Sequence, residues 1–145
     1  MNKEEMPFKQ EEFGQFEPKS VSRFIVEFKP PFNIPKFVVK STTRPTIVIT
    51  NGGHKWEEMV FSMYDPIVPS TSQSLMTGLR ELRKLDDQTI EVNLTLLGPV
   101  GDKVEEWLIK GTINKVDFGT LDWETTEPLI IKLYLNVTYC VLLYS

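Results

Sequence analysis

Residues 129–139 read Leu-Ile-Ile-Lys-Leu-Tyr-Leu-Asn-Val-Thr-Tyr, and this stretch decides the fold class. The odd-numbered positions are all apolar: Leu129, Ile131, Leu133, Leu135, Val137 and Tyr139. The even-numbered positions from 132 to 138 are more polar. Successive side chains of a β-strand point to opposite faces, so this alternation predicts a long strand with one buried face.

Similar alternation extends outward from this strand over most of the chain. It predicts further strands at 21–28, 36–40, 46–50, 56–64, 89–97 and 104–118. We expect 36–40 to pair with the strand before it. Asn51-Gly52-Gly53 is a turn signal that makes 46–64 a long hairpin. In 104–118 we expect two faces, with Trp107, Ile109 and Ile113 on one and Leu108, Thr112 and Val116 on the other.

One segment has helical rather than strand periodicity. Ser70 and Gln73 have the spacing of a capping box, and Leu75, Leu79 and Leu82 recur behind them at helical intervals. Gly78 in this helix indicates close packing of the helix on a sheet. The sequence therefore predicts a mainly β protein, an antiparallel β-barrel or sandwich of about seven strands, with one flanking α-helix before the last three strands.

The predicted domain organisation is an N-terminal arm over 1–20 and a single β domain over 21–145. The arm shows no helical or strand period. It is either a frayed terminus or a segment whose aromatic residues dock on a neighbouring subunit. These aromatic residues are Phe8, Phe13 and Phe16.

Composition excludes several classes of protein. The net charge of −4 over 145 residues argues against adhesive binding to nucleic acid, which needs a basic face. No apolar run approaches the roughly 20 residues of a membrane-spanning helix, and the N-terminus lacks the pattern of a secretory signal. The single cysteine, Cys140, excludes an internal disulfide and is expected to be a buried thiol in a protein assembled in a reducing cytoplasm.

A search for catalytic, cofactor and metal sites finds none in the sequence. His54 is the sole histidine and has no second histidine to share a metal or a proton. The acidic pair Asp86-Asp87 follows the predicted helix, as expected for a solvated turn. Trp56, Trp107 and Trp123 are either core and interface anchors or a platform for stacking sugars or bases. We therefore predict a structural protein rather than an enzyme.

The most specific motif lies just before the last strand. The chain runs Phe118-Gly119-Thr120-Leu121-Asp122-Trp123, followed by a polar turn and the long strand from Leu129. This pattern resembles the C-terminal signature of the tail tube proteins of contractile-tailed bacteriophages. The passage from Trp56 to Leu82 resembles the strand-to-helix region of the same family. The resemblance covers residues 21–143.

The resemblance implies a subunit of a phage tail inner tube. Such subunits are expected to form hexameric rings, which stack into a hollow conduit for the genome inside a contractile sheath. The hairpin with Ile47, Ile49, His54 and Trp56 would contact the next ring. The implied partners are other copies of the chain, the sheath protein, the tape measure protein, and baseplate and tail terminator proteins. DNA would pass through without specific binding, and the protein would reside in the virion, without membrane insertion.

Two alternatives remain open at the level of sequence. The tubes of type VI secretion and contractile injection systems, and a baseplate protein that initiates a tube, share the same fold family. A monomeric β-sandwich that binds carbohydrate through its tryptophans belongs to a different class. Ring formation distinguishes the first from the second.

Overall fold

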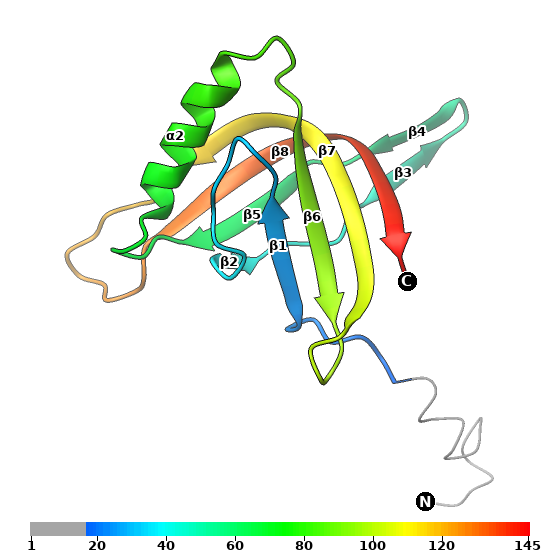
Figure 1. Ribbon diagram of the computed structural model, residues 1–145, viewed down its shortest axis with the longest axis horizontal. Helices are drawn as coiled ribbons and strands as arrows, with labels where there is room; N and C mark the ends of the chain where they lie inside the picture. Colours follow the sequence, from blue (N-terminus) through cyan, green and yellow to red (C-terminus); the bar gives the residue numbers. More distant parts are fainter. Residues whose placement is uncertain (1–16) are drawn as a thin grey trace, which may run out of the picture.

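A curled antiparallel sheet forms most of the protein. The computed structural model describes residues 17–145. Six strands follow one another across the sheet in the order β1-β6-β7-β8-β5-β2, and the sheet closes into a near-complete barrel (Figure 1). These strands are β1 (Phe24–Phe28), β2 (Val39–Ser41), β5 (Met59–Tyr64), β6 (Ile90–Leu97), β7 (Lys103–Asp117) and β8 (Ile130–Tyr144). A separate two-stranded sheet pairs β3 (Ile47–Thr50) with β4 (Gly53–Trp56).

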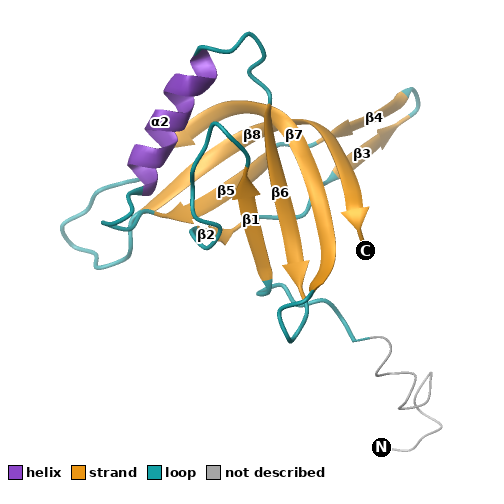
Figure 2. Cartoon of the chain, viewed as in Figure 1, coloured by secondary structure: helices purple, strands orange, loops and turns teal. Residues whose placement is uncertain are grey.

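The predicted fold class is confirmed, with a change in the strand count. Residues 17–145 contain eight strands and one helix, α2 (Thr71–Arg83), which precedes the last three strands and flanks the barrel (Figure 2). The additional strand arises because 56–64 is not one strand. Glu57 and Glu58 separate β4 from β5, so the predicted long hairpin ends at Trp56, and β5 pairs with β8 in the barrel. No helix in the described residues is long and apolar enough to span a membrane.

The partner predicted for 36–40 was wrong. Only Val39–Ser41 is a strand, and it pairs with β5, whereas β1 pairs with β6. The connection between β1 and β2, residues 29–38, buries Phe32 and Ile34 and links the two edge strands of the sheet. The chain therefore arrives at the opposite edge of the sheet.

The core lies inside the curled sheet. From Ile131 to Val137 the predicted apolar face of β8 is buried, but Leu129 and Tyr139 are exposed. The register between β7 and β8 shifts at Lys110 and Gly111, so that Tyr139 lies opposite Lys110 and Cys140 lies opposite Ile109. Cys140 takes the core position instead, and the prediction of a buried thiol is confirmed.

A second irregularity corrects the predicted faces of β7. The register shifts between Ile113 and Lys115, which places Ile113 opposite Leu135 and Val116 opposite Leu133. Both Ile113 and Val116 consequently pack against the core, although strict alternation had put them on different faces. A β-bulge inserts one extra residue into a strand, so every later side chain in that strand points to the face opposite the one that strict alternation predicts.

Helix α2 forms as the sequence predicts. The Ser70 hydroxyl accepts a hydrogen bond from the backbone N–H of Gln73 at 3.2 Å, which caps the helix. Leu75 and Leu82 are buried. A Cβ atom at Gly78 would lie 2.3 Å from the Phe32 ring, so this glycine allows the helix to approach the β1–β2 connection. The close packing predicted at Gly78 is therefore present, but it is against a loop side chain and not against the sheet.

Candidate assembly surfaces

The β3–β4 hairpin projects away from the barrel (Figure 1). Its register pairs Ile47 with Trp56 and Ile49 with His54, so the four residues expected to contact a neighbour form two cross-strand pairs. Ile49 is 72% exposed, whereas Trp56 is half-buried and packs against the core. The His54 ring meets the Trp56 ring edge to face, with centroids 6.2 Å apart. Trp56 thus fixes the base of a hairpin whose outer part is open to solvent and carries one large apolar side chain, Ile49.

The motif residues Phe118, Gly119, Leu121, Asp122 and Trp123 lie in the connection between β7 and β8, residues 118–129. Gly119 has a φ of 108°, which favours glycine, and its N–H donates to Asp117 Oδ1 at 2.9 Å. Leu121 is 85% exposed and Trp123 is fully exposed. The motif is therefore a surface loop that presents large apolar side chains.

Two further exposed apolar residues lie just beyond the same end of the sheet. Tyr64 at the end of β5 pairs with Ile130 at the start of β8, and Asp117 at the end of β7 pairs with Lys132. Ile67 and Val68 follow β5 and are almost fully exposed. We call these two residues, together with Leu121 and Trp123, the end-loop patch. Sequence reasoning missed Ile67 and Val68. The available signal was their position between Pro66 and Pro69, where no strand or helix can form to bury them.

The hairpin and the end-loop patch lie at opposite ends of β5. Met59, at the start of β5, follows directly on the hairpin and pairs with Leu135, while Tyr64 leads into the patch. Figure 1 shows the hairpin on one side of the barrel and the 118–129 connection on the other. The subunit therefore has two distinct apolar ends.

Both long strands extend beyond their neighbours. The pairing of β6 with β7 stops at Gly111, so 112–117 of β7 pairs only with β8. The pairing of β5 with β8 stops at Leu135, so 136–144 of β8 has β7 as its only strand partner in the described chain. Leu142, Leu143 and Tyr144 in this extension are exposed. Such open, apolar strand edges are templates for pairing with another chain.

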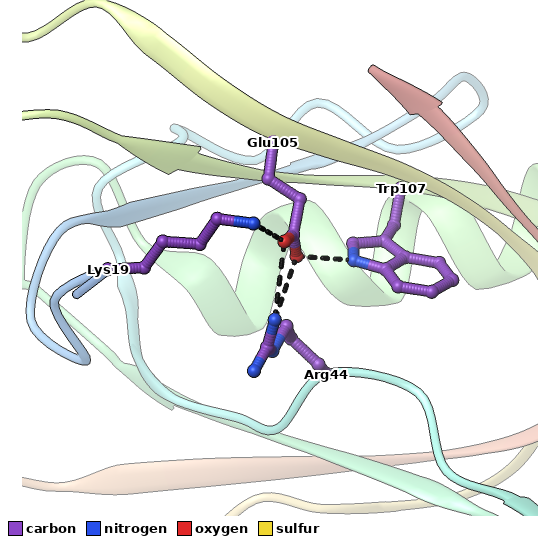
Figure 3. A network of polar contacts seen from close by, with 4 residues as sticks. All are labelled: Lys19, Arg44, Glu105 and Trp107. Atoms are coloured by element: carbon purple, nitrogen blue, oxygen red, sulfur yellow. Dashed lines mark hydrogen bonds and ion pairs between the residues drawn. The ribbon is translucent and has the colours of Figure 1, made fainter. Parts of the chain in front are cut away.

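A buried carboxylate joins three distant segments. Glu105 on β7 is only 3% exposed, and Lys19 Nζ lies 2.6 Å from its Oε1 (Figure 3). Arg44, in the connection from β2 to the hairpin, donates to both carboxylate oxygens at 3.2 and 3.4 Å. The indole N–H of Trp107 donates to Oε2 at 2.6 Å. We call these four residues the Glu105 network.

Burial and hydrogen bonding act in opposite directions on Glu105. Burial raises the pKa of the carboxyl, but the hydrogen bonds from Lys19 and Trp107 and the charges of Lys19 and Arg44 outweigh it, so the pKa is below its ordinary value. The carboxylate is thus charged and fully partnered at neutral pH. It ties residue 19 and residue 44, which lead toward the N-terminal segment and the hairpin, to one point on β7. The rest of the predicted arm, residues 1–16 with Phe8, Phe13 and Phe16, lies outside the described residues.

Sequence reasoning missed the Glu105 network. Glu105 has the same strand parity as Trp107 and Ile109, so it occupies a core-facing position. An acidic residue at such a position requires charged partners, and that requirement was the available signal.

Lysine and tyrosine side chains alternate across the outer face of the sheet. All four tyrosines of the chain lie beneath a lysine ammonium, at distances from Nζ to the ring centroid of 4.3–5.9 Å. The pairs are Lys40–Tyr64, Lys103–Tyr144, Lys110–Tyr139 and Lys115–Tyr134. Lys103 and Lys110 also have carboxylate partners, Glu106 and Glu91. The fold therefore brings scattered lysines onto one charge-balanced face.

The described residues offer no catalytic constellation. No group of three or more His, Cys, Asp or Glu side chains in 17–145 is arranged to hold a metal ion. Burial raises the pKa of the Cys140 thiol to about 11, so the thiol is protonated at neutral pH. Of the three tryptophans, Trp56 and Trp107 pack against the core and only Trp123 is exposed. They do not form one exposed stacking platform.

Comparison with known proteins identifies the fold but no sequence family. No family model matches the chain, and no curated protein matches it in sequence. Among solved structures, a chain of the PVC sheath–tube complex, an extracellular contractile injection system in the extended state, matches with a TM-score of 0.62 at 11% identity. The match covers 95% of this chain and 99% of the other.

Two further matches come from the anti-feeding prophage. A chain of its six-fold symmetrised baseplate matches with a TM-score of 0.59 at 21% identity, covering 88% of this chain and 96% of the other. A chain of its tube-terminating cap matches with the same TM-score at 11% identity, covering 88% and 92%. This protein thus has, over nearly its whole length, the fold of chains found in contractile injection assemblies.

Proposed function

We propose that this protein is a ring-forming subunit of the inner tube of a contractile tail or injection apparatus. The observation that carries the proposal is the fold match to a chain of a sheath–tube complex, which leaves almost no part of either chain uncovered. The partners in such an assembly are further copies of this chain, a sheath protein, a tape measure protein, and baseplate and terminator proteins. The protein acts structurally and not as an enzyme.

The open strand edges supply a means of closing a ring. The extension of β8 at 136–144 and that of β7 at 112–117 each have one free side in the described chain. Pairing between copies along these edges would continue the sheet from subunit to subunit and remove an aggregation hazard. The β3–β4 hairpin, with Ile47, Ile49, His54 and Trp56, would then contact the next ring.

Two versions of the apparatus differ in what passes through the tube. In a phage tail, the tube is a conduit for the genome, and a net charge of −4 would disfavour adhesion of DNA. In an injection particle it would carry other cargo, and the fold matches to PVC and anti-feeding prophage chains favour this second version. Neighbouring genes for a capsid and tape measure would support the phage tail, and genes for secreted effectors would support the injection particle.

Negative-stain microscopy of the purified protein over a range of concentrations tests the proposal. We expect stacked annuli or hollow tubes. Leu143→Lys places a charge on the open edge of β8 and should prevent rings, whereas Val100→Lys, in the exposed turn after β6, should not. Uniform monomers at every concentration, together with binding of a sugar ligand, would instead establish the carbohydrate-binding class.

A further inference from the structure

We infer that the end-loop patch of one copy is the docking site for the β3–β4 hairpin of a second copy, so that copies join head to tail. This inference rests on the proposed function, since it identifies the surface that receives the hairpin. The hairpin alone does not identify the surface that it contacts. The shape and charge of the opposite end of the subunit point to that surface.

The first observation is that each end is apolar and exposed. Ile49 on the hairpin is 72% exposed, and Leu121 and Trp123 on the patch are 85% and fully exposed. Ile67 and Val68 extend the patch along the segment that follows β5. Large exposed apolar side chains gathered at one end of a subunit mark an interaction surface, and tryptophan is among the residues most enriched at the centre of one.

The second observation is a hollow beside the patch. The 118–129 connection, with its flanking residues, surrounds a space of about 360 Å³. Leu121, Leu129 and Ile130 give it an apolar lining, and Asp117, Asp122 and Glu127 outnumber the single lysine there, Lys132. A convex apolar group with a positive charge nearby fits such a space.

Beside the hairpin tip, Ile49 is the exposed apolar group and Lys55 is the positive charge. Lys55 is exposed next to His54, on the strand opposite Ile49, and the tip residues 51–53 carry no charge. The acids of the hollow therefore face the opposite charge on the hairpin. Like-charged ends would oppose association, so this arrangement favours hairpin-to-patch contact over contact between two patches.

The third observation is the direction in which the two ends lie. They are at opposite ends of β5, so a hairpin-to-patch contact joins two different surfaces. A dimer formed in this way still has one unoccupied hairpin and one unoccupied patch. A contact of this kind is heterologous and repeats without limit unless rotation closes it. It therefore builds a stack along the direction of β5, while the open strand edges remain available for pairing within a ring.

Cysteine cross-linking tests the inference directly. Cys140 is buried with a raised pKa, so engineered surface cysteines are the reactive ones. Asn51→Cys at the hairpin tip and Thr120→Cys beside the hollow are made as separate proteins, mixed, and treated with a short bis-maleimide. We expect a dimer only in the mixture, and a ladder of oligomers when one chain carries both substitutions. Val100→Cys mixed with Asn51→Cys is the matched control and should give no dimer.

A double-mutant cycle adds an energetic readout. Ile49→Ala and Trp123→Ala should each raise the concentration needed for tubes about tenfold to thirtyfold, as truncation of a central interface residue does. The two changes together should cost less than the product of the single effects, because they remove the same contact. Val100→Ala removes an equally exposed apolar side chain elsewhere and should have no effect.

The outcomes separate the inference from the proposed function. Tubes that form without hairpin-to-loop cross-links would overturn the inference and leave the tube role intact. Monomers in the microscope that still give the mixed dimer would support the inference and count against spontaneous ring assembly. Cross-links of Asn51→Cys to itself would show a symmetric contact and overturn the head-to-tail arrangement.

Discussion

The middle of the barrel and its two ends use the same kinds of residue for different purposes. At the centre, Phe61, Leu133 and Ile131 are fully buried and hold the sheet around one core. At the ends, Ile49, Leu121 and Trp123 are also large, mainly apolar side chains, but they lie open to solvent. Burial in the centre stabilises the subunit, whereas the exposed side chains contribute nothing to folding. The difference agrees with the proposal that the ends contact other copies of the chain.

The largest expected effect is the loss of a central aromatic ring. Phe61→Ala should lower the free energy of unfolding by about 4 kcal/mol, because it leaves a cavity where Phe61 packs against Phe28 with ring centroids 5.4 Å apart. Urea unfolding of dilute protein measures it. Trp123→Ala is the control from the other region and should change unfolding by less than about 0.5 kcal/mol. Equal losses of unfolding free energy in the two variants would show that the centre and the ends do not differ in their contribution to stability.

The next effect concerns the close approach of β7 and β8 at Gly111. A Cβ atom at Gly111 would lie 2.3 Å from the backbone oxygen of Asn136, so Gly111→Ala forces β7 and β8 apart. We expect a loss of about 2–3 kcal/mol of unfolding free energy, measured by thermal or urea denaturation. Gly52→Ala at the hairpin tip meets no atom within 4 Å and should be nearly neutral. An unchanged unfolding free energy in Gly111→Ala would show that β7 and β8 can move apart at this register shift without loss of stability.

The Glu105 network gives a pH-dependent effect. Glu105→Gln removes the charge that Lys19 and Arg44 contact, and should lower the unfolding free energy by about 2 kcal/mol at pH 7. The pKa of this carboxyl is lowered from 4.5 on folding, so its stabilising contribution is complete above pH 4.5 and is lost as the pH falls through the lower folded-state value. The difference in unfolding free energy between wild type and Glu105→Gln should therefore shrink as the pH falls. A difference that stays constant down to pH 3 would contradict a stabilising role for the charge of Glu105.

The smallest effect is at the start of α2, next to the end-loop patch. Ser70→Ala removes the oxygen that accepts from Gln73 N–H and should cost about 1 kcal/mol in unfolding free energy. Thr77→Ala, at an exposed position in the middle of the same helix, should be neutral or slightly stabilising because alanine has the higher helix propensity. Asp65 also accepts from Thr71 and Ser72 N–H, so the helix start retains a second cap. Denaturation with circular dichroism detection compares the two variants.

The positions of the strands and the helix could be predicted from sequence because alternation and capping are local patterns. What failed was long-range: Val39–Ser41 pairs with β5 rather than with the strand before it in the chain, because the connection leads to the other edge of the sheet. The faces of Val116 and Tyr139 depend on register shifts that only the partner strand defines. Neither leaves a periodic signal in the sequence.

The candidate surfaces divide in the same way. The exposure of Ile47, Ile49 and the residues around Trp123 follows from a turn signal and a local motif. The convergence of Lys19, Arg44 and Glu105 joins residues far apart in the chain, and the four lysine–tyrosine pairs require the sheet order. Their assembly roles remain proposals for the experiments above.

In the proposed tube, the β3–β4 hairpin would also have a kinetic consequence. It is a two-stranded sheet anchored at its base by Trp56, and two strands alone are marginally stable in water. Ordering its tip on a neighbour therefore costs conformational entropy, which a single contact between two copies offsets poorly. Addition to a complete ring engages several such contacts at once. Growth should then show a lag and a critical concentration, and a preformed end should act as a seed.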